Sequence, residues 1–241
     1  MLFAAHQPHY LPWLRYLHKV ATADVFVLLD DVQYEKNGWQ NRTRVKGADG
    51  PILLTVPVRA PLGARICDVR PPDAGWVRRH LAALESCYGR ALAPWREPLA
   101  DALEASHGAS VAELGEATLD LLLRAFGITT PVVRSSELGV AGRASERLAA
   151  IGQALGADAY LTGAYALDAY LDPGPFAEAG IRLAVQRWAC PGYRQRFERV
   201  GFTADLSAVD LLVNEPARPL TILLQGEEGA SDPALAANAR A

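Results

Sequence analysis

Residues 1–29, MLFAAHQPHYLPWLRYLHKVATADVFVLL, contain the pattern of a strand, a helix and a second strand. Leu2 to Ala5 is a short apolar strand, and Val25 to Leu29 is a continuous apolar run typical of a strand covered on both faces. Between them, Trp13 to Thr22 has apolar residues at helical spacing. Pro12 suits the helix start because a missing N–H costs nothing there. The stretch therefore predicts a βαβ unit.

The middle of the chain first predicts paired strands and then helices. Residues 44–46 and 52–58 flank a Gly-Ala-Asp-Gly turn, which favours a hairpin. A helical pattern follows over residues 76–88. A long amphipathic pattern then covers residues 99–126, and we expect it to break at its glycines, Gly108 and Gly115.

Strand and helix patterns alternate again toward the C-terminus. They comprise a strand at 131–134, a helix at 145–155, a strand at 159–163, an apolar segment at 182–188 and a helix at 206–213. Such alternation favours parallel strands, because parallel neighbours need a crossover connection. We therefore predict an α/β, Rossmann-like fold, with a mostly parallel sheet, helices on both faces and a helical middle segment. We expect one domain over residues 1–225 with its helical insertion at about 75–128, and a flexible tail at 226–241.

Composition narrows the classes of protein. A net charge of −3 gives no general electrostatic footprint for nucleic acid or an anionic membrane surface. The three cysteines form no CxxC pair, so they indicate neither a disulfide framework nor a zinc site. The start lacks a secretory signal pattern, and no apolar stretch approaches the roughly 20 residues that span a bilayer. We expect a cytoplasmic protein with neither DNA nor a membrane as partner.

Polar and aromatic residues of little use in a core crowd at three successive element ends near the N-terminus. They are His6, Gln7, His9, Tyr10 and Trp13, then Asp30, Asp31 and Gln33, then Trp39, Gln40, Asn41, Arg42 and Arg44. Such clustering indicates a binding site at the edge of an α/β sheet. A second group follows the strand predicted at 159–163, and we expect it to line the substrate half of the same crevice: Tyr160, Gly163, Tyr165, Tyr170 and Asp172, with Gln186 and Tyr193. Packing of aromatics under a loop explains the tyrosines equally well.

Candidate roles follow from residue chemistry, and each has a structural alternative. His6 suits proton transfer or phosphate contact, or it caps a strand end. Asp30 and Asp31 suit an amine or Mg²⁺, although paired acids after a strand often cap the following turn. Arg42 and Arg44 suit bidentate recognition of phosphate or carboxylate, or surface salt bridges.

Two further residues come from the predicted helix over 76–88. His80 is a candidate binding residue, or a core-facing histidine held by one hydrogen bond. Cys87 would need a nearby base to act as a nucleophile, and a cysteine inside a helix is more often an inert small hydrophobe.

Several ordered blocks resemble the WbqC-like protein family over nearly the whole chain. They include residues 6–8, 10–13, Lys19, 24–27, 29–34, 39–42, 56–58, His80, Tyr88, 135–138, 156–161, Gly163, 170–172 and 207–212. The resemblance implies a transferase, since members occur in O-antigen and other polysaccharide gene clusters and glycine or aminoacyl transfer has been suggested for some. This chain departs from the family at two positions: Arg15 stands where the family usually has glycine, and His9 where it has asparagine.

We expect an enzyme that joins an amino or acyl group to a small polar acceptor, such as a nucleotide-linked amino sugar or a secondary metabolite. Arg42 and Arg44 would hold an anionic group, and His6 would move a proton or stabilise a developing charge. Asp30 or Asp31 would position an amine or Mg²⁺. A carrier-protein or aminoacyl-tRNA donor stays open, although the net charge gives no support for a large RNA surface.

Two alternatives belong to other classes. The spacing His6-x-x-His9 is similar to that of nucleotidyltransferases and carboxylate-activating enzymes, which would use ATP with Mg²⁺ and place phosphates over residues 8–13. A non-catalytic sugar-binding or assembly partner would instead have a pocket without a closely placed histidine and carboxylate. The sequence names neither donor nor acceptor.

Overall fold

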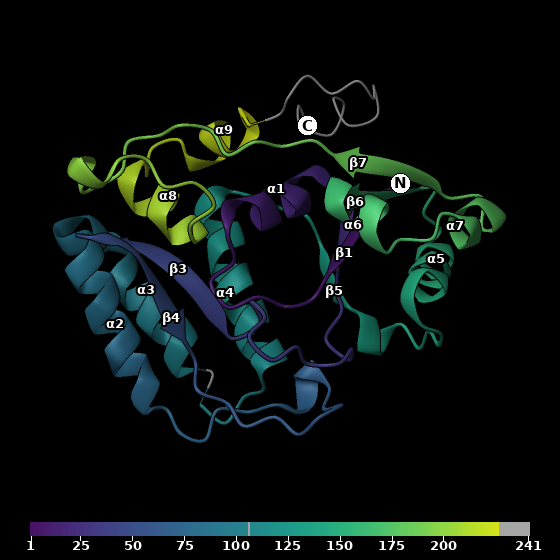
Figure 1. The fold of residues 1–241 in the computed structure, drawn as a ribbon, viewed down its shortest axis with the longest axis horizontal. Coiled ribbons are helices and arrows are strands. Elements are labelled where there is room, and N and C mark those ends of the chain that lie inside the picture. Colours follow the sequence, from purple (N-terminus) through teal and green to yellow (C-terminus); the bar gives the residue numbers. More distant parts are fainter. Residues whose placement is uncertain (106, 227–241) are drawn as a thin grey trace.

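Five parallel strands form the central sheet of the molecule (Figure 1). The computed structural model describes residues 1–105 and 107–226. The strand order is β5-β2-β1-β6-β7, and every neighbouring pair is parallel. The strands are β1 (Leu2–His6), β2 (Val25–Leu28), β5 (Val132–Arg134), β6 (Ala159–Gly163) and β7 (Arg182–Gln186). With the helices described next, this order confirms the predicted α/β, Rossmann-like fold.

Helices cover both faces of this sheet. Figure 1 shows α1 (Leu14–Thr22) and α4 (Val111–Phe126) on one side of it, and α5 (Ala144–Leu155) and α7 (Gly174–Glu178) on the other. Residues of β1 alternate between two apolar clusters, because successive side chains of a strand point to opposite faces. Leu2 and Ala4 pack in the cluster with α1 and α4, while Phe3 and Ala5 pack with α5 and α7.

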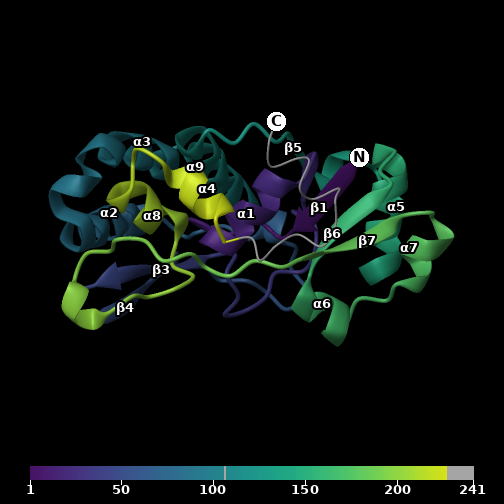
Figure 2. The ribbon, with the colours of Figure 1, turned by 90° about the horizontal axis from the view of Figure 1, so that it is seen from above.

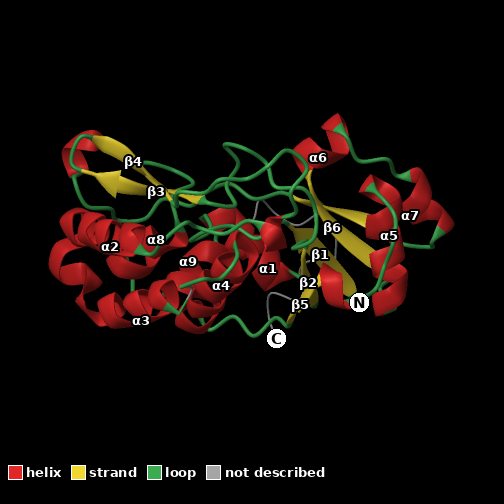
Figure 3. Cartoon of the chain, turned by 90° about the horizontal axis from the view of Figure 1, so that it is seen from below, coloured by secondary structure: helices red, strands yellow, loops and turns green. Residues whose placement is uncertain are grey.

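The hairpin and the two helices between β2 and α4 form a separate layer beyond α4. Figures 2 and 3 show the hairpin and the helices α2 and α3 at the end of the molecule farthest from β7. The elements are β3 (Arg42–Gly47), β4 (Gly50–Thr55), α2 (Gly75–Tyr88) and α3 (Ala93–Glu104). The remaining helices are α6 (Ala164–Ala169), α8 (Ala208–Asn214) and α9 (Pro219–Leu224), with 3-10 turns η1 (Ile66–Asp68), η2 (Gly89–Leu92), η3 (Ser135–Glu137) and η4 (Glu198–Val200).

Two expectations from the sequence need correction. The second hairpin strand ends at Thr55 rather than at residue 58, and the amphipathic pattern over 99–126 has one break instead of two, between α3 and α4. The chain breaks near Gly108 as expected, but Gly115 lies inside α4. A Cβ at Gly115 would lie 2.8 Å from the Pro8 Cβ, so this glycine permits close packing rather than ending a helix.

The predicted tail falls almost wholly outside the described residues, since it covers 226–241 and the structure describes the chain to 226. Over the ranges that are described, no helix combines the length and the apolar character needed to cross a membrane.

Candidate functional site

The strand order reverses between β1 and β6, and the two strands separate there. From β1 the chain continues to β2 and then β5 on one side, whereas β6 and β7 lie on the other. The β1–β6 pairing stops at Ala4 and Leu161, although β1 continues to His6 and β6 continues to Gly163. In open parallel sheets, ligands bind in the crevice outside the carboxyl ends of the strands at such a point.

Two histidine rings meet at the carboxyl end of β1. The alternation of the strand places His6 on the face covered by α1, and its ring centroid lies 4.6 Å from that of His9. The Tyr16 ring of α1 lies 5.0 Å from each of them, and its hydroxyl donates to the Gln7 carbonyl. The start of α1 therefore packs directly against the histidine pair.

Both histidines are held in the neutral form. Burial lowers the pKa of His6 to about 3, and the Lys19 charge adds to this effect, while a hydrogen bond to the Gln7 carbonyl opposes it. Burial, His6 and Lys19 place the pKa of His9 well below its usual value. His9 Nδ1 is buried with no hydrogen-bond partner among the residues described. Unprotonated imidazole nitrogen is therefore available at this end of β1.

Lys19 is the functional candidate that single-residue reasoning on the sequence missed. It lies one helical turn after Tyr16, its side chain is only 9% exposed, and no described residue gives it a hydrogen bond or an ion pair. Burial lowers the pKa of Lys19 to about 8, and the positive charge of Arg15 adds to the shift. Its position beside Tyr16 on the predicted helix was the available signal.

An aromatic wall continues from the histidines toward the hairpin. The Trp13 ring contacts His9 at 4.9 Å edge to face and Trp39 at 5.1 Å. The Arg44 guanidinium lies over the Trp39 ring at 5.4 Å, a cation–π contact. Gln40 Nε2 donates to Gln7 Oε1 at 2.6 Å. Residues from β1, the α1 start and the β3 region thus meet in one place, as the sequence predicts.

The loop between β1 and α1 is held in a strained conformation. Leu11 has a φ of 43°, in the left-handed region that leucine rarely adopts. Its N–H donates to Thr118 Oγ1 at 3.2 Å, and its carbonyl accepts from Thr43 Oγ1 at 2.8 Å. Strain of this kind persists where surrounding structure fixes it, and it is common beside functional sites.

The predicted acidic residues end β2, the strand beside β1. Asp30 accepts hydrogen bonds from the Ser135 hydroxyl and from the Ser136 N–H and hydroxyl. Asp31 pairs with Arg147 at 2.6 Å and also accepts from Ser135. These contacts tie β2 to the segment after β5, and within the described ranges no three His, Cys, Asp or Glu residues gather as a metal site. A role in positioning an amine or Mg²⁺ stays a prediction.

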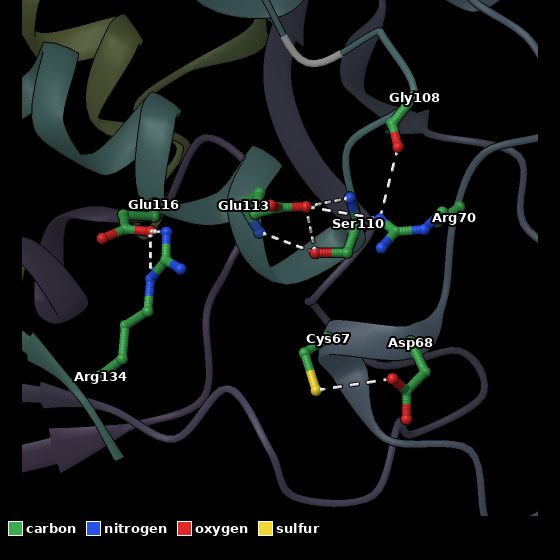
Figure 4. A network of polar contacts seen from close by, with 8 residues as sticks. All are labelled: Cys67, Asp68, Arg70, Gly108, Ser110, Glu113, Glu116 and Arg134. Atoms are coloured by element: carbon green, nitrogen blue, oxygen red, sulfur yellow. Dashed lines mark hydrogen bonds and ion pairs between the residues drawn. The ribbon is translucent and has the colours of Figure 1, made fainter. Parts of the chain in front are cut away.

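A small charged cavity lies beside Asp30. Its volume is about 90 Å³, and Figure 4 shows part of its polar lining. Arg134 pairs with Glu116, and Arg70 lies 3.4 Å from Glu113. Glu113 also forms the capping box of α4 with Ser110. Each of these four charged side chains thus has a partner inside the protein. The cavity is lined by ion pairs rather than by charges that are free to bind a ligand.

A model of the WbqC-like protein family matches residues 7–221 of the chain. The chain belongs to this family. A relative named Uncharacterized protein Rv1507c, from Mycobacterium tuberculosis (strain ATCC 25618 / H37Rv), is 32% identical over 217 residues, covering 86% of this chain and 91% of the relative. No solved structure matches the chain.

In this WbqC-like protein, the two positions that depart from the family flank the crevice. His9 belongs to the histidine pair. Arg15 contacts Trp188, which follows β7, instead of the histidines. Its NH1 donates to the Trp188 carbonyl at 2.6 Å, and its guanidinium lies over the Trp188 ring at 5.2 Å. Arg15 therefore holds the segment after β7 against α1.

Several predicted site residues of this WbqC-like protein lie in the core instead. The Tyr10 hydroxyl is 2.9 Å from His80 Nδ1, and burial lowers the pKa of His80 to about 4. Asn41 is fully engaged, since it accepts from the Tyr34 hydroxyl and donates to the Val56 carbonyl. These contacts explain the three side chains by packing and hydrogen bonding. For His80 they match the alternative given above, a core-facing histidine held by one hydrogen bond.

The two predicted arginines and Gln33 lie along the hairpin side. Arg42 donates to Asn37 Oδ1, and its Nε is buried with no partner among the described residues. Gln33 forms an isolated bridge with Arg65 rather than joining the histidines. Of these three residues, Arg44 is the one that contacts the aromatic wall, through its cation–π contact with Trp39.

The second predicted group is divided by the fold. Gly163 ends β6 with open space where a Cβ would lie. The Tyr165 and Tyr170 side chains are exposed and their rings are 6.3 Å apart. Tyr160 does not line the crevice, because strand alternation turns it to the other face, where it stacks on Phe176.

Gln186, Tyr193, Asp172 and Cys87 have contacts of their own. Gln186 Nε2 lies near the Arg15 carbonyl and His18 Nδ1, and the Tyr193 hydroxyl donates to Asp210 Oδ2. Asp172 Oδ1 accepts from the Gly174 N–H, as in a turn cap. Burial raises the pKa of the Cys87 thiol, so it lacks the thiolate character of a nucleophile.

Proposed function

We propose that this WbqC-like protein is a transferase that joins an amino or acyl group to a small polar acceptor. The observation that supports this is the contact between two neutral histidines at the point where the sheet order reverses. A pair of unprotonated imidazoles beside a crevice suits proton removal from an attacking amine or hydroxyl. The family resemblance points in the same direction.

The proposed step is a substitution at an acyl carbon. The acceptor nitrogen or oxygen bonds to that carbon, the bond from the carbon to the donor's leaving group breaks, and the acceptor's proton passes to a histidine. His9 Nδ1 is the better base in geometry, because it is buried and no described residue hydrogen-bonds to it. Trp13 and Trp39 form an apolar wall that limits the access of water to the intermediate.

The substrate classes proposed here are those that the sequence suggests. The donor carries glycine, another amino acid or an acyl group, on a carrier protein or a tRNA. The acceptor is a nucleotide-linked amino sugar of polysaccharide synthesis or a secondary metabolite. Arg44, stacked on Trp39, would contact an anionic part of the acceptor, and we place the reaction in the cytoplasm.

The test has two stages. A thermal-shift screen over ATP, nucleotide sugars, amino acids and acyl thioesters identifies the stabilising ligands, because ligands that bind the folded state raise its stability. Transfer is then measured for the wild type and for His6→Gln and His9→Gln. We expect either change to lower kcat by about 100-fold or more.

His80→Gln is the matched control, since His80 is buried but contacts Tyr10 in the core. It is expected to lower stability and leave kcat within a few fold. Full turnover in both His6→Gln and His9→Gln, with folding intact, would remove the site assignment.

A second candidate function is that of a nucleotidyltransferase or an ATP-dependent carboxylate-activating enzyme. The order β5-β2-β1-β6-β7 matches the 3-2-1-4-5 part of nucleotide-binding Rossmann sheets. Against it, Trp13 is bridged to Ser207 and the Pro12 carbonyl accepts from the Ala208 N–H, so α8 covers the entry to α1 where phosphates would lie. Release of pyrophosphate from ATP and Mg²⁺ in the presence of a carboxylate substrate would favour this candidate over simple transfer.

A non-catalytic binding protein is the third candidate. No carboxylate among the described residues forms a hydrogen bond or an ion pair with His6 or His9, which is the arrangement expected for this class. Such a protein would bind its ligand and form no product. Ligand stabilisation without turnover under every donor and acceptor combination would support it.

A further inference from the structure

The crevice at the end of β1 contains a positive charge that no described residue balances. Lys19 is buried, and no described residue supplies an anion to it. Its neighbours His6 and His9 are both neutral at physiological pH. Buried charges in proteins are ordinarily paired, because an unpaired ion in an apolar environment is strongly unfavourable.

The Lys19 side chain is directed toward the histidines. Helical side chains tilt toward the N-terminal end of their helix, and residues three apart share a face. Tyr16, one turn earlier on α1, contacts both imidazole rings. The same helical face therefore brings the Lys19 amine toward His6 and His9, and this agrees with its electrostatic effect on each of them.

The structure is open at Gly163, on the far side of the crevice from β1. Continuing the β1–β6 register by two residues from Ala4 and Leu161 brings His6 level with Gly163. Apart from Gly163 itself and its two chain neighbours, no atom of the described residues lies within 4 Å of the position that a Cβ of Gly163 would occupy. The φ of Gly163 is −79°, which any residue adopts, so the backbone conformation itself does not require glycine. The absent side chain keeps the space beside His6 open.

We propose that this crevice binds a carboxylate group of the substrate, with the Lys19 ammonium as its ion-pair partner. A carboxylate carries one negative charge, which matches one ammonium beside two neutral rings. A phosphate dianion would need a second positive charge, which neither histidine supplies. Arg15, the other cation that acts on Lys19, is engaged with the Trp188 carbonyl and Asp205. The inference rests on the proposed function only in assigning the carboxylate to the substrate of the transfer.

Carboxylate binding would also prepare the base. The Lys19 charge lowers the pKa of both histidines, so an anion that neutralises it raises both values. His6, whose pKa is about 3 in the free protein, then becomes a stronger proton acceptor only after the substrate is in place. Substrate binding and proton transfer are coupled through Lys19.

Acetate is the probe, and its binding is followed by calorimetry or ligand-detected NMR. Acetamide has the same shape without the charge and is expected to bind at least about tenfold more weakly than acetate, since it forms no ion pair. Acetate remains ionised from pH 6 to pH 10. Because the pKa of Lys19 is about 8, the acetate affinity should fall about tenfold for each pH unit above that value.

Three variants test the residues. Lys19→Met is expected to abolish acetate binding at every pH. Lys19→Arg, whose charge persists at high pH, is expected to bind acetate with no loss up to pH 10. Gly163→Val fills the open space beside His6 and is expected to weaken binding by about tenfold or more while the fold stays intact. The exposed Arg199 pairs with Asp49 on the hairpin, and Arg199→Met is the control that should bind as the wild type does.

Equal binding of acetate and acetamide, or undiminished acetate binding in Lys19→Met, would overturn the carboxylate site. Tighter, Lys19-dependent binding of inorganic phosphate than of acetate would also overturn it, in favour of a phosphate site. If Lys19→Met does not fold, the pH profile of the wild type and Gly163→Val still decide. Transfer activity in a protein that fails the acetate test would leave the proposed function standing without this inference.

Discussion

At the scale of single residues, two buried lysines have opposite surroundings. The Lys46 ammonium donates to Gln195 Oε1 at 3.0 Å and to the Gly201 carbonyl at 2.5 Å. Its charge also favours the ionised form of the buried carboxylate of Asp210, whose pKa is nonetheless raised by burial. Lys19 is also buried, but it has no such partners among residues 1–105 and 107–226. Lys46 therefore stabilises the fold through its hydrogen bonds, whereas the buried charge of Lys19 lowers the stability of the fold.

Lys19→Met should raise the free energy of unfolding at pH 7 by up to about 3 kcal/mol, the equivalent of the shift in the lysine pKa from 10.5 to about 8. Because the folded pKa is lower than the unfolded one, the unfolded chain binds more protons between these values. The wild type should thus gain stability from pH 8 to 10.5, and Lys19→Met should not. Urea denaturation at pH 7 and pH 10 measures both effects.

Lys46→Met provides the comparison, and we expect it to lower stability because it leaves Gln195 and the Gly201 carbonyl without their donor. Similar losses of stability in the two lysine variants would mean that Lys19 is not an unbalanced charge.

At the scale of elements, the loop from β1 to α1 is fixed by two threonines from distant parts of the chain. Thr43 lies in β3 and Thr118 in α4, and they bind the carbonyl and the N–H of Leu11. Close packing of Gly115 against Pro8 brings α4 within reach of this loop. The helical middle segment therefore shapes the site although it lies outside the parallel sheet.

Thr118→Val keeps the shape of the side chain and removes the acceptor for the Leu11 N–H. We expect a loss of about 1–3 kcal/mol in the free energy of unfolding, because a buried donor is left unpaired. We also expect weaker ligand binding, since the loop carries His9. Thr118→Ser retains the hydroxyl and should recover most of the binding. Wild-type binding and stability in Thr118→Val would show that the hydrogen bond does not fix the loop.

At the scale of the whole molecule, buried neutral histidines recur in several places. Burial lowers the pKa of His6 and of His18 to about 3, that of His80 to about 4, and that of His9 well below its usual value. Below pH 6.5, each of these histidines therefore binds a proton more readily in the unfolded chain than in the folded chain. Their contribution to stability is fully present above pH 6.5 and is lost as the pH falls toward the folded values.

The free energy of unfolding should therefore decrease steeply in acid, with each such histidine contributing up to about 1.4 kcal/mol per pH unit between pH 6 and pH 4. Urea denaturation at pH 7, 6 and 5 gives the slope. His80→Gln should reduce the change in the free energy of unfolding per pH unit by about the contribution of one histidine. An unchanged slope in this variant would mean that His80 is not a neutral group that must be charged on acid unfolding.

The sequence by itself determined the parallel α/β fold and the end of the sheet where polar residues gather. Both rest on local patterns, which can be read directly from the sequence. Examples are the apolar run from Val25 to Leu28, the helical spacing after Pro12 and the polar residues after each strand. Family membership was readable for the same reason, from ordered blocks of residues.

Only the tertiary structure decided which of those residues share a site. It placed Tyr10, Asn41 and His80 in the core and gave Asp30 and Asp31 serine and arginine partners. It left Lys19 without a partner among the residues that are described. Burial and the presence of a partner depend on contacts between segments far apart in the chain, which spacing along the sequence does not encode. The separation of β1 from β6 beside Gly163 is likewise a property of the assembled sheet.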